Sequence, residues 1–158
     1  TDNPNLLVMK SISKSYGVPG LRLGILASAN TTLIETMKKD VAIWNINSFA
    51  EYFMQIFSKY ENDYHSACNK FRSEREAFFK ELSDIDFIKV IESQANYFLC
   101  EVTSRYTSSS LTQTLLEQHN ILIKDCSTKT AFQGRDYIRI AIRNRADNHT
   151  LYKILKTL

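Results

Sequence analysis

A lysine flanked by hydroxyl-bearing residues is the feature of this sequence best suited to chemistry. Ser11, Ser13 and Ser15 surround Lys14, and Arg22 follows eight positions after the lysine. Hydroxyls and a guanidinium supply several hydrogen-bond donors to a phosphate dianion, and arginine can bind such an anion through two parallel bonds. A lysine amine held beside an anion site can form a Schiff base with an aldehyde. The loop therefore predicts a site for a cofactor that carries both an aldehyde and a phosphate.

Glycines shape the same loop. Three of the four glycines in the chain are Gly17, Gly20 and Gly24, and glycine permits tight turns and close approach of the backbone. Their spacing is neither the G-x-G-x-x-G of dinucleotide-binding folds nor that of a P-loop. The loop therefore favours pyridoxal 5'-phosphate over a nucleotide.

Strands and helices are predicted to alternate around this loop. Short apolar runs at 6–9 and 22–27 are typical of buried strands, and the pattern becomes helical from Thr31. Apolar residues recur at three- and four-residue steps over 49–82, which indicates a long helix or a kinked pair of helices. In the second half, strands are predicted at 87–92, 97–102, 121–123 and 137–142, and helices at 111–119 and 145–158. This order predicts an α/β sandwich.

Bulk composition excludes several classes of protein. The 158 residues have a net charge of +3 and no basic run, so no nucleic-acid partner is predicted. Cys68, Cys100 and Cys126 lack CxxC spacing, and the histidines lack partners at metal-binding spacing, so we expect no metal site. No apolar run approaches the roughly 18 residues of a membrane span. The chain is therefore expected to be cytoplasmic, with no membrane partner.

The loop also carries a family signature. Its arrangement S-x-S-K-x-x-G-x-x-G-x-R-x-G resembles the cofactor-lysine signature of the class I/II aminotransferases, the fold-type I pyridoxal-phosphate enzymes. The resemblance implies that Lys14 carries the cofactor and acts as catalytic acid and base. It also implies that Ser11 and Arg22 hold the cofactor phosphate, with Ser13 as a neighbouring hydroxyl.

Two shorter segments resemble one branch of the family, which contains histidinol-phosphate aminotransferase and threonine-phosphate decarboxylase. The first is W-N-I-N-S-F-A, beginning at Trp44, and this tryptophan either packs at a domain or dimer junction or contacts the substrate. The second is Q-A-N-Y-F, beginning at Gln94. In it, Asn96 either faces the active site and binds substrate or serves only as a turn residue.

An alternating strand is predicted near the C-terminus. Over 137–143 the isoleucines share one face, and Arg139, Ala141 and Arg143 share the other. The resemblance implies that Arg139 binds the α-carboxylate of an amino-acid substrate. Arg143 either grips a second acidic group or is simply exposed to solvent.

The resemblance also implies an organisation. Residues 1–40 would be the end of the large cofactor-binding domain, 41–83 the connecting helices, and 84–158 the small C-terminal domain. The family's residues around the pyridine ring precede the lysine segment and would lie upstream of Thr1. The 158 residues are therefore expected to be an incomplete, inactive fragment.

The function implied is that of a biosynthetic aminotransferase, working as a homodimer. It would move an amino group between an amino acid or amino-alcohol phosphate and a 2-oxo acid. Two alternatives stay open: a pyridoxal-phosphate-dependent decarboxylase of a phosphorylated amino acid, and a non-catalytic, aminotransferase-like regulatory domain.

Overall fold

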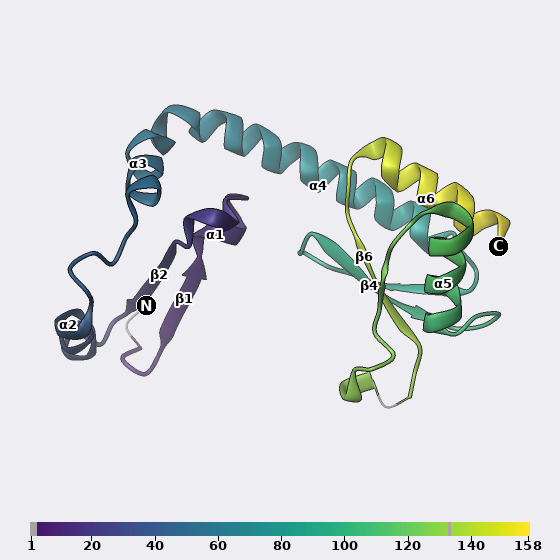
Figure 1. Cartoon of the computed structure of the whole chain (residues 1–158), viewed down its shortest axis with the longest axis horizontal. Helices are drawn as coiled ribbons and strands as arrows, with labels where there is room; N and C mark the ends of the chain where they lie inside the picture. Colours follow the sequence, from purple (N-terminus) through teal and green to yellow (C-terminus); the bar gives the residue numbers. More distant parts are fainter. Residues whose placement is uncertain (1–2, 133) are drawn as a thin grey trace. The chain divides into compact units, whose positions relative to one another are not determined.

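The chain divides into two compact units, Thr1–Ser66 and Ala67–Leu158 (Figure 1). The computed structural model describes residues 3–132 and 134–158. The boundary falls inside the longest helix, α4 (Glu61–Ser83). The three-part division expected from the sequence, with boundaries after residues 40 and 83, stays a prediction.

An antiparallel two-stranded sheet carries the lysine loop in the first unit. β1 (Leu7–Ser11) and β2 (Gly24–Ser28) confirm the two strands predicted there. The loop between them contains α1 (Ile12–Ser15) and the 3-10 turn η1 (Pro19–Leu21). Neither strand holds a buried residue, so the predicted burial is wrong, because the described residues of this unit leave the two strands largely exposed.

Three helical segments follow the sheet. α2 (Thr31–Asp40) begins at Asn30, whose side chain accepts a hydrogen bond from the Leu33 amide at 2.9 Å. α3 (Ser48–Ile56) and α4 are separated by the 3-10 turn η2 (Phe57–Tyr60), which confirms the kinked pair. A small core gathers residues from the loop and from α3, namely Ile12, Leu23 and Ala50, with Tyr16, Leu21 and Phe53 packed against them.

The second unit is built on a four-stranded antiparallel sheet with the order β3-β4-β6-β5. Its strands are β3 (Ile88–Ile91), β4 (Tyr97–Val102), β5 (Lys124–Asp125) and β6 (Tyr137–Ala141). Two helices follow strands in the chain, α5 (Ser108–His119) and α6 (Arg145–Thr157).

Helices cover one face of this sheet. Along β6, Ile138 and Ile140 are buried whereas Arg139 and Ala141 are exposed, because successive side chains of a strand point to opposite faces. The buried face packs against helical residues Phe78, Leu82, Leu111, Leu115, Leu151 and Leu155. Each such burial stabilises the fold by about 1.5–3 kcal/mol. The predicted α/β architecture is therefore confirmed, and the sheet keeps one exposed face.

The strand predicted at 121–123 is wrong, because the paired residues are Lys124 and Asp125. The end of α5 explains the shift. Asn120 adopts the left-handed conformation (φ 56°), and the Ile121 amide bonds back to the Leu115 carbonyl at 3.0 Å. The backbone at 120–121 therefore completes the helix cap before the strand can begin.

No helix among the described residues is both long and apolar enough to cross a membrane.

Candidate active site

Lys14 lies on α1, immediately after β1, and its side chain is exposed. The Tyr16 amide donates a hydrogen bond to the Ile12 carbonyl at 3.0 Å, which completes the single turn of this helix. Gly17 follows with a φ of +68° and turns the chain. Among the residues that the structure describes, none forms a hydrogen bond or ion pair with the Lys14 amine. The side chain of Lys14 therefore extends from the loop without a described partner.

Aromatic rings anchor this short helix to the helices of the same unit. The Tyr16 ring lies 4.7 Å from the ring centroid of Phe57 and 4.6 Å from that of Tyr64. The Tyr64 hydroxyl donates to the Ser15 carbonyl at 3.2 Å. The backbone on the C-terminal side of Lys14 is thus held by ring packing and by a hydrogen bond.

Ser13 joins the two ends of the loop. The residue is buried, and its hydroxyl accepts a hydrogen bond from the Leu23 amide at 2.8 Å and donates to the Leu23 carbonyl at 3.3 Å. Ser13 therefore ties α1 to the residue that precedes β2. Its predicted contact with a cofactor stays a prediction.

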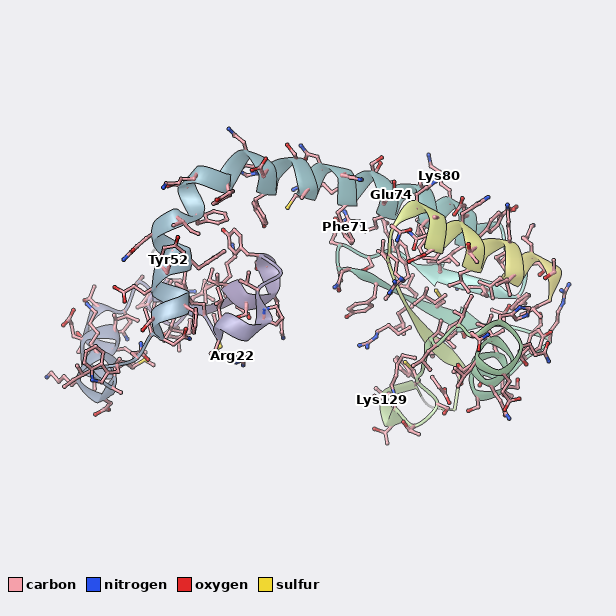
Figure 2. The ribbon with its side chains drawn as sticks, turned by 45° about the horizontal axis from the view of Figure 1, so that its top comes forward. Arg22, Tyr52, Phe71, Glu74, Lys80 and Lys129 are labelled. Atoms are coloured by element: carbon pink, nitrogen blue, oxygen red, sulfur yellow. The ribbon has the colours of Figure 1, made fainter. Side chains whose placement is uncertain are left out.

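Ser11 and Arg22 are the two predicted phosphate ligands, and both are exposed. Figure 2 labels Arg22 in the loop that follows α1. The Arg22 guanidinium donates one hydrogen bond, from Nη1 to the Pro19 carbonyl at 3.2 Å, and keeps its other donors. A free amine, an exposed hydroxyl and an arginine with spare donors fit an aldehyde that carries a phosphate. The residues present thus agree with the predicted cofactor.

A groove of about 650 Å³ runs beside Arg22. One side is formed by Leu21–Gly24 and the other by Trp44–Ser48 with Ala50. Trp44 is 90% exposed, and Asn47 bridges the two sides with a bond from its Nδ2 to the Leu21 carbonyl at 2.9 Å. Sequence reasoning did not single out Asn47, because nothing in the spacing of residues 21 and 47 indicates that they meet.

Arg139 lies on the exposed face of the sheet in the second unit. Its guanidinium stacks over the Tyr97 ring, 5.2 Å from the centroid. In the register of the sheet, Arg139 lies opposite Leu99 on β4 and Lys124 on β5. Arg139 and Lys124 also line one groove of about 530 Å³.

Neither of these two cations forms an ion pair with a described residue. Like charges directly opposite each other destabilise a sheet, so a bound anion would relieve the repulsion. Asp125 lines the same groove, but its carboxylate accepts hydrogen bonds from the Ser109 hydroxyl at 2.6 Å and the Ser127 amide at 2.8 Å. Lys124 was not predicted as a site residue, because the strand was predicted at 121–123, three residues before β5 begins.

Asn96 lies in the bend before β4 and is exposed. Its carbonyl accepts a hydrogen bond from the Ile142 amide at 3.0 Å, which continues the pairing of β4 with β6. The backbone of Asn96 thus has a structural role, and its predicted contact with substrate stays a prediction.

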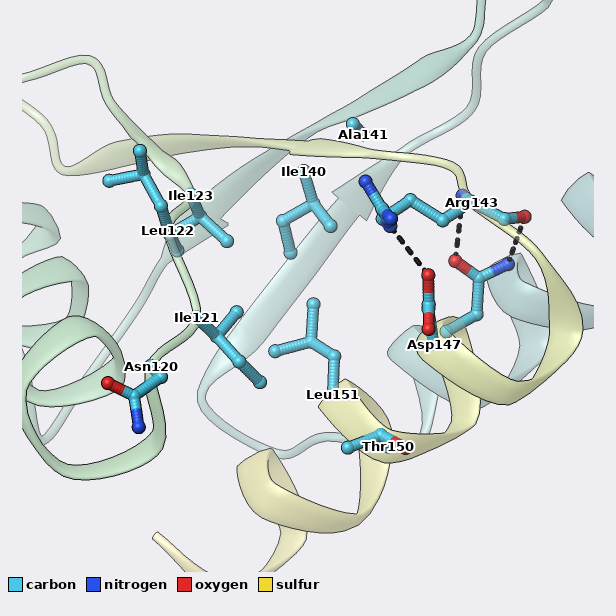
Figure 3. A pocket seen from close by; sticks show the side chains of 11 residues that line it. Asn120, Ile121, Leu122, Ile123, Ile140, Ala141, Arg143, Asp147, Thr150 and Leu151 are labelled. Atoms are coloured by element: carbon cyan, nitrogen blue, oxygen red, sulfur yellow. Dashed lines mark hydrogen bonds and ion pairs between the residues drawn. The ribbon is translucent and has the colours of Figure 1, made fainter.

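Arg143 lies beside a pocket of about 430 Å³ at the start of α6 (Figure 3). Its side chain is 70% exposed, and Nε lies 2.7 Å from Oδ2 of Asp147. The buried Asn148 holds the Arg143 backbone through two hydrogen bonds of 2.9 Å. Arg143 is therefore exposed and ion-paired within its own unit.

Residues 1–155 match the family model Aminotransferase class I and II, and the chain belongs to this family. Enzymes of this family depend on pyridoxal phosphate. The fold is similar to that of the histidinol-phosphate aminotransferase from Clostridium acetobutylicum, with a TM-score of 0.86 and 27% identity over 99% of this chain and 46% of that one.

Two relatives are similar in sequence over most of the chain. The CMP-5'-(3-aminopropyl)phosphonate synthase of Streptomyces rubellomurinus is 35% identical over 93% of this chain and 23% of its own length. The L-serine phosphate decarboxylase of Sulfurospirillum multivorans is 30% identical over 98% of this chain and 40% of its own length. Relatives also include threonine-phosphate decarboxylase and histidinol-phosphate aminotransferase, which confirms the predicted branch. The chain spans less than half the length of these relatives.

Proposed function

We propose that this chain is part of a pyridoxal-phosphate enzyme that acts on a phosphorylated amino acid. The observation that carries the proposal is the pair of cations Arg139 and Lys124, which lie at paired positions of one sheet face and form no ion pair with a described residue. A substrate with a carboxylate and a phosphate supplies two anionic groups for them. The names of the relatives support this class, because they share an amino compound that bears a phosphate or phosphonate.

The lysine loop would hold the cofactor. The cofactor, when bound, supplies an electron sink for the bonds at the α-carbon. Lys14 would hold it covalently and, as general acid and base, would take or return the proton at the α-carbon. Ser11 and Arg22 would donate hydrogen bonds to its phosphate, and Ser13 keeps the loop in shape through Leu23.

The exposed sheet face would hold the substrate. Arg139, braced by the Tyr97 ring, binds the α-carboxylate and so sets the orientation of the reacting bond. Lys124 then binds the phosphate. Asn96 contributes a further polar contact to the substrate.

Decarboxylation is the first candidate reaction. It is favoured by the 30% identity to a decarboxylase named for serine phosphate, a compound that bears both anionic groups. Transamination is the second candidate, favoured by the likeness to histidinol-phosphate aminotransferase. It would use a 2-oxo acid as a further small-molecule substrate.

Product analysis with the intact protein and pyridoxal phosphate separates the two reactions. With O-phospho-L-serine, decarboxylation releases carbon dioxide and forms O-phosphoethanolamine without an acceptor. Transamination instead consumes an added 2-oxo acid and releases no carbon dioxide. A protein that does neither, although it binds the cofactor, would contradict both and favour the regulatory alternative.

We also propose that the intact protein is a homodimer. Ile43, Trp44 and Phe49 lie close together in the sequence and are 93%, 90% and 80% exposed, and exposed apolar side chains are covered in many interfaces between proteins. Light scattering of the intact protein tests the proposal. A dimer that Trp44→Glu converts to a monomer is the expected result, whereas a monomeric parent would contradict it.

A further inference from the structure

Arg22 adopts a backbone conformation that side-chain-bearing residues rarely take. Its φ and ψ of 53° and 40° lie in the left-handed region, where the Cβ atom crowds the following carbonyl oxygen. Such a conformation persists only where the surroundings hold it. The contacts of the adjacent residues therefore decide whether Arg22 is presented in one fixed geometry.

Hydrogen bonds hold the chain on both sides of Arg22. On its C-terminal side, the Leu23 amide donates to the buried Ser13 hydroxyl at 2.8 Å. On its N-terminal side, the Leu21 carbonyl accepts from Nδ2 of Asn47 at 2.9 Å. Asn47, at the start of α3, thus adds a hydrogen bond to the apolar packing between that helix and the turn.

The orientation of the Asn47 side chain is fixed by its second bond. Its Oδ1 accepts from the Ala50 amide at 2.9 Å and so caps α3. A backbone amide can only donate, so the amide oxygen must face Ala50 and the NH₂ group must face Leu21. One side chain therefore both caps a helix and ties that helix to the Arg22 turn.

We infer that Asn47 is a positioning residue for the cofactor phosphate, acting by holding Arg22 in its left-handed turn. The inference rests on the proposed function, in which Arg22 binds that phosphate. Asn47 and Arg22 line the same groove of about 650 Å³, and the bond to Leu21 joins its two sides. Loss of that bond would leave the turn held on its C-terminal side by Ser13, so that the guanidinium would be positioned less firmly for the phosphate.

The test compares two probes that differ only in the phosphate: pyridoxal phosphate and pyridoxal. Dissociation constants are measured by equilibrium dialysis on the intact protein and on Asn47→Ser. Serine still caps a helix well but is shorter and has no amide donor for Leu21. We expect affinity for pyridoxal phosphate to fall roughly two- to tenfold, the effect of one neutral hydrogen bond. Affinity for pyridoxal stays unchanged.

The matched control is Asn30→Ser. Asn30 caps α2 through the Leu33 amide at 2.9 Å, as Asn47 caps α3, and no described residue accepts a hydrogen bond from its side-chain amide. Its substitution is expected to leave both dissociation constants unchanged. A loss for both probes in Asn47→Ser would reveal a general loosening of the fold and would overturn the inference, as would no loss at all.

Arg22→Ala separates this inference from the proposed function. Selective loss of pyridoxal phosphate in Arg22→Ala supports the assigned phosphate contact, and Asn47→Ser should then add no further loss in the Arg22→Ala background. A further loss in that double variant would show that Asn47 acts independently of Arg22 and overturn the positioning role. If Arg22→Ala affects both probes equally, the phosphate assignment of Arg22 itself fails.

Discussion

Other residues hold the backbone on which Lys14 and Arg22 lie. Ser13 and Asn47 bond to the residues on either side of Arg22, and Tyr64 bonds to the carbonyl of Ser15. The residues that would touch the cofactor are exposed, whereas Ser13 is buried. At the residue scale, the side chains proposed to contact the cofactor are thus distinct from those that maintain the shape of the loop.

Ser13→Ala tests this division. The substitution leaves the Leu23 amide without its partner in a buried position, which costs about 1–3 kcal/mol of unfolding free energy. Ser15→Ala is the control, because the exposed Ser15 hydroxyl bonds only to the Ser11 carbonyl of its own turn. Its effect should stay within about 0.5 kcal/mol. Urea unfolding of the intact protein measures both, and equal costs would contradict the structural role of Ser13.

Lys124→Gln tests the substrate class. Removal of one cation from the groove is expected to raise KM for O-phospho-L-serine about tenfold or more, because charge-assisted hydrogen bonds contribute about 1.5–3 kcal/mol. KM for L-serine should not change. Lys129→Gln, an exposed lysine of the same unit outside this groove, is the control (Figure 2). The same rise for both substrates would argue against a phosphate site at Lys124.

At the element scale, Asp125 joins the edge strand β5 to helix α5. Partial burial alone would raise the pKa of Asp125, but hydrogen bonds from Ser109 and Ser127 outweigh it and bring the pKa from 3.8 to about 2. A depressed pKa means that the folded state favours the carboxylate. Its contribution to stability is present above about pH 4 and is lost as the pH falls through about 2.

Asp125→Asn should therefore destabilise the protein at neutral pH, and its difference from the parent should vanish as the pH falls to about 2. Unfolding free energies measured by urea titration across that range provide the test. Asp40→Asn, at the end of α2, is the control, since no described residue bonds to the Asp40 side chain. A difference that persists unchanged at pH 2 would contradict the role given to the carboxylate.

The elements differ in how far their sequences predict them. The alternation of Ile138, Arg139 and Ile140 predicts both the strand β6 and its exposed cationic face, because period-two patterns follow from strand geometry. The later start of β5, at Lys124, was not predictable. Residues 121–123 are as apolar as those of a strand, and the left-handed cap at Asn120 moves the paired residues further along the chain.

The candidate site, too, is only partly predictable from the sequence. Lys14 and Arg22 are predictable because their motif is continuous in sequence, and the roles assigned to them remain to be tested. Asn47 and Lys124 depend on contacts between distant residues, namely Leu21 with Asn47 and the register of β5 against β6. Such contacts are fixed by packing and leave no local pattern in the sequence.

At the scale of the whole molecule, the chain matches its family over residues 1–155 yet spans 23–46% of the relatives described above. The loop proposed to bind the cofactor belongs to the first unit, and the sheet face proposed to bind the substrate belongs to the second. Activity therefore has to be measured on the intact protein, and residues of both units must be varied.

The most direct test of the central claim is to trap the cofactor on its lysine. The intact protein is incubated with pyridoxal phosphate, reduced with borohydride and digested, and the peptides are analysed by mass spectrometry. We expect the mass of the reduced cofactor on Lys14, and we expect it to be lost in Lys14→Ala. Label on a different lysine, or none at all, would contradict the assignment of this chain's loop as the cofactor site.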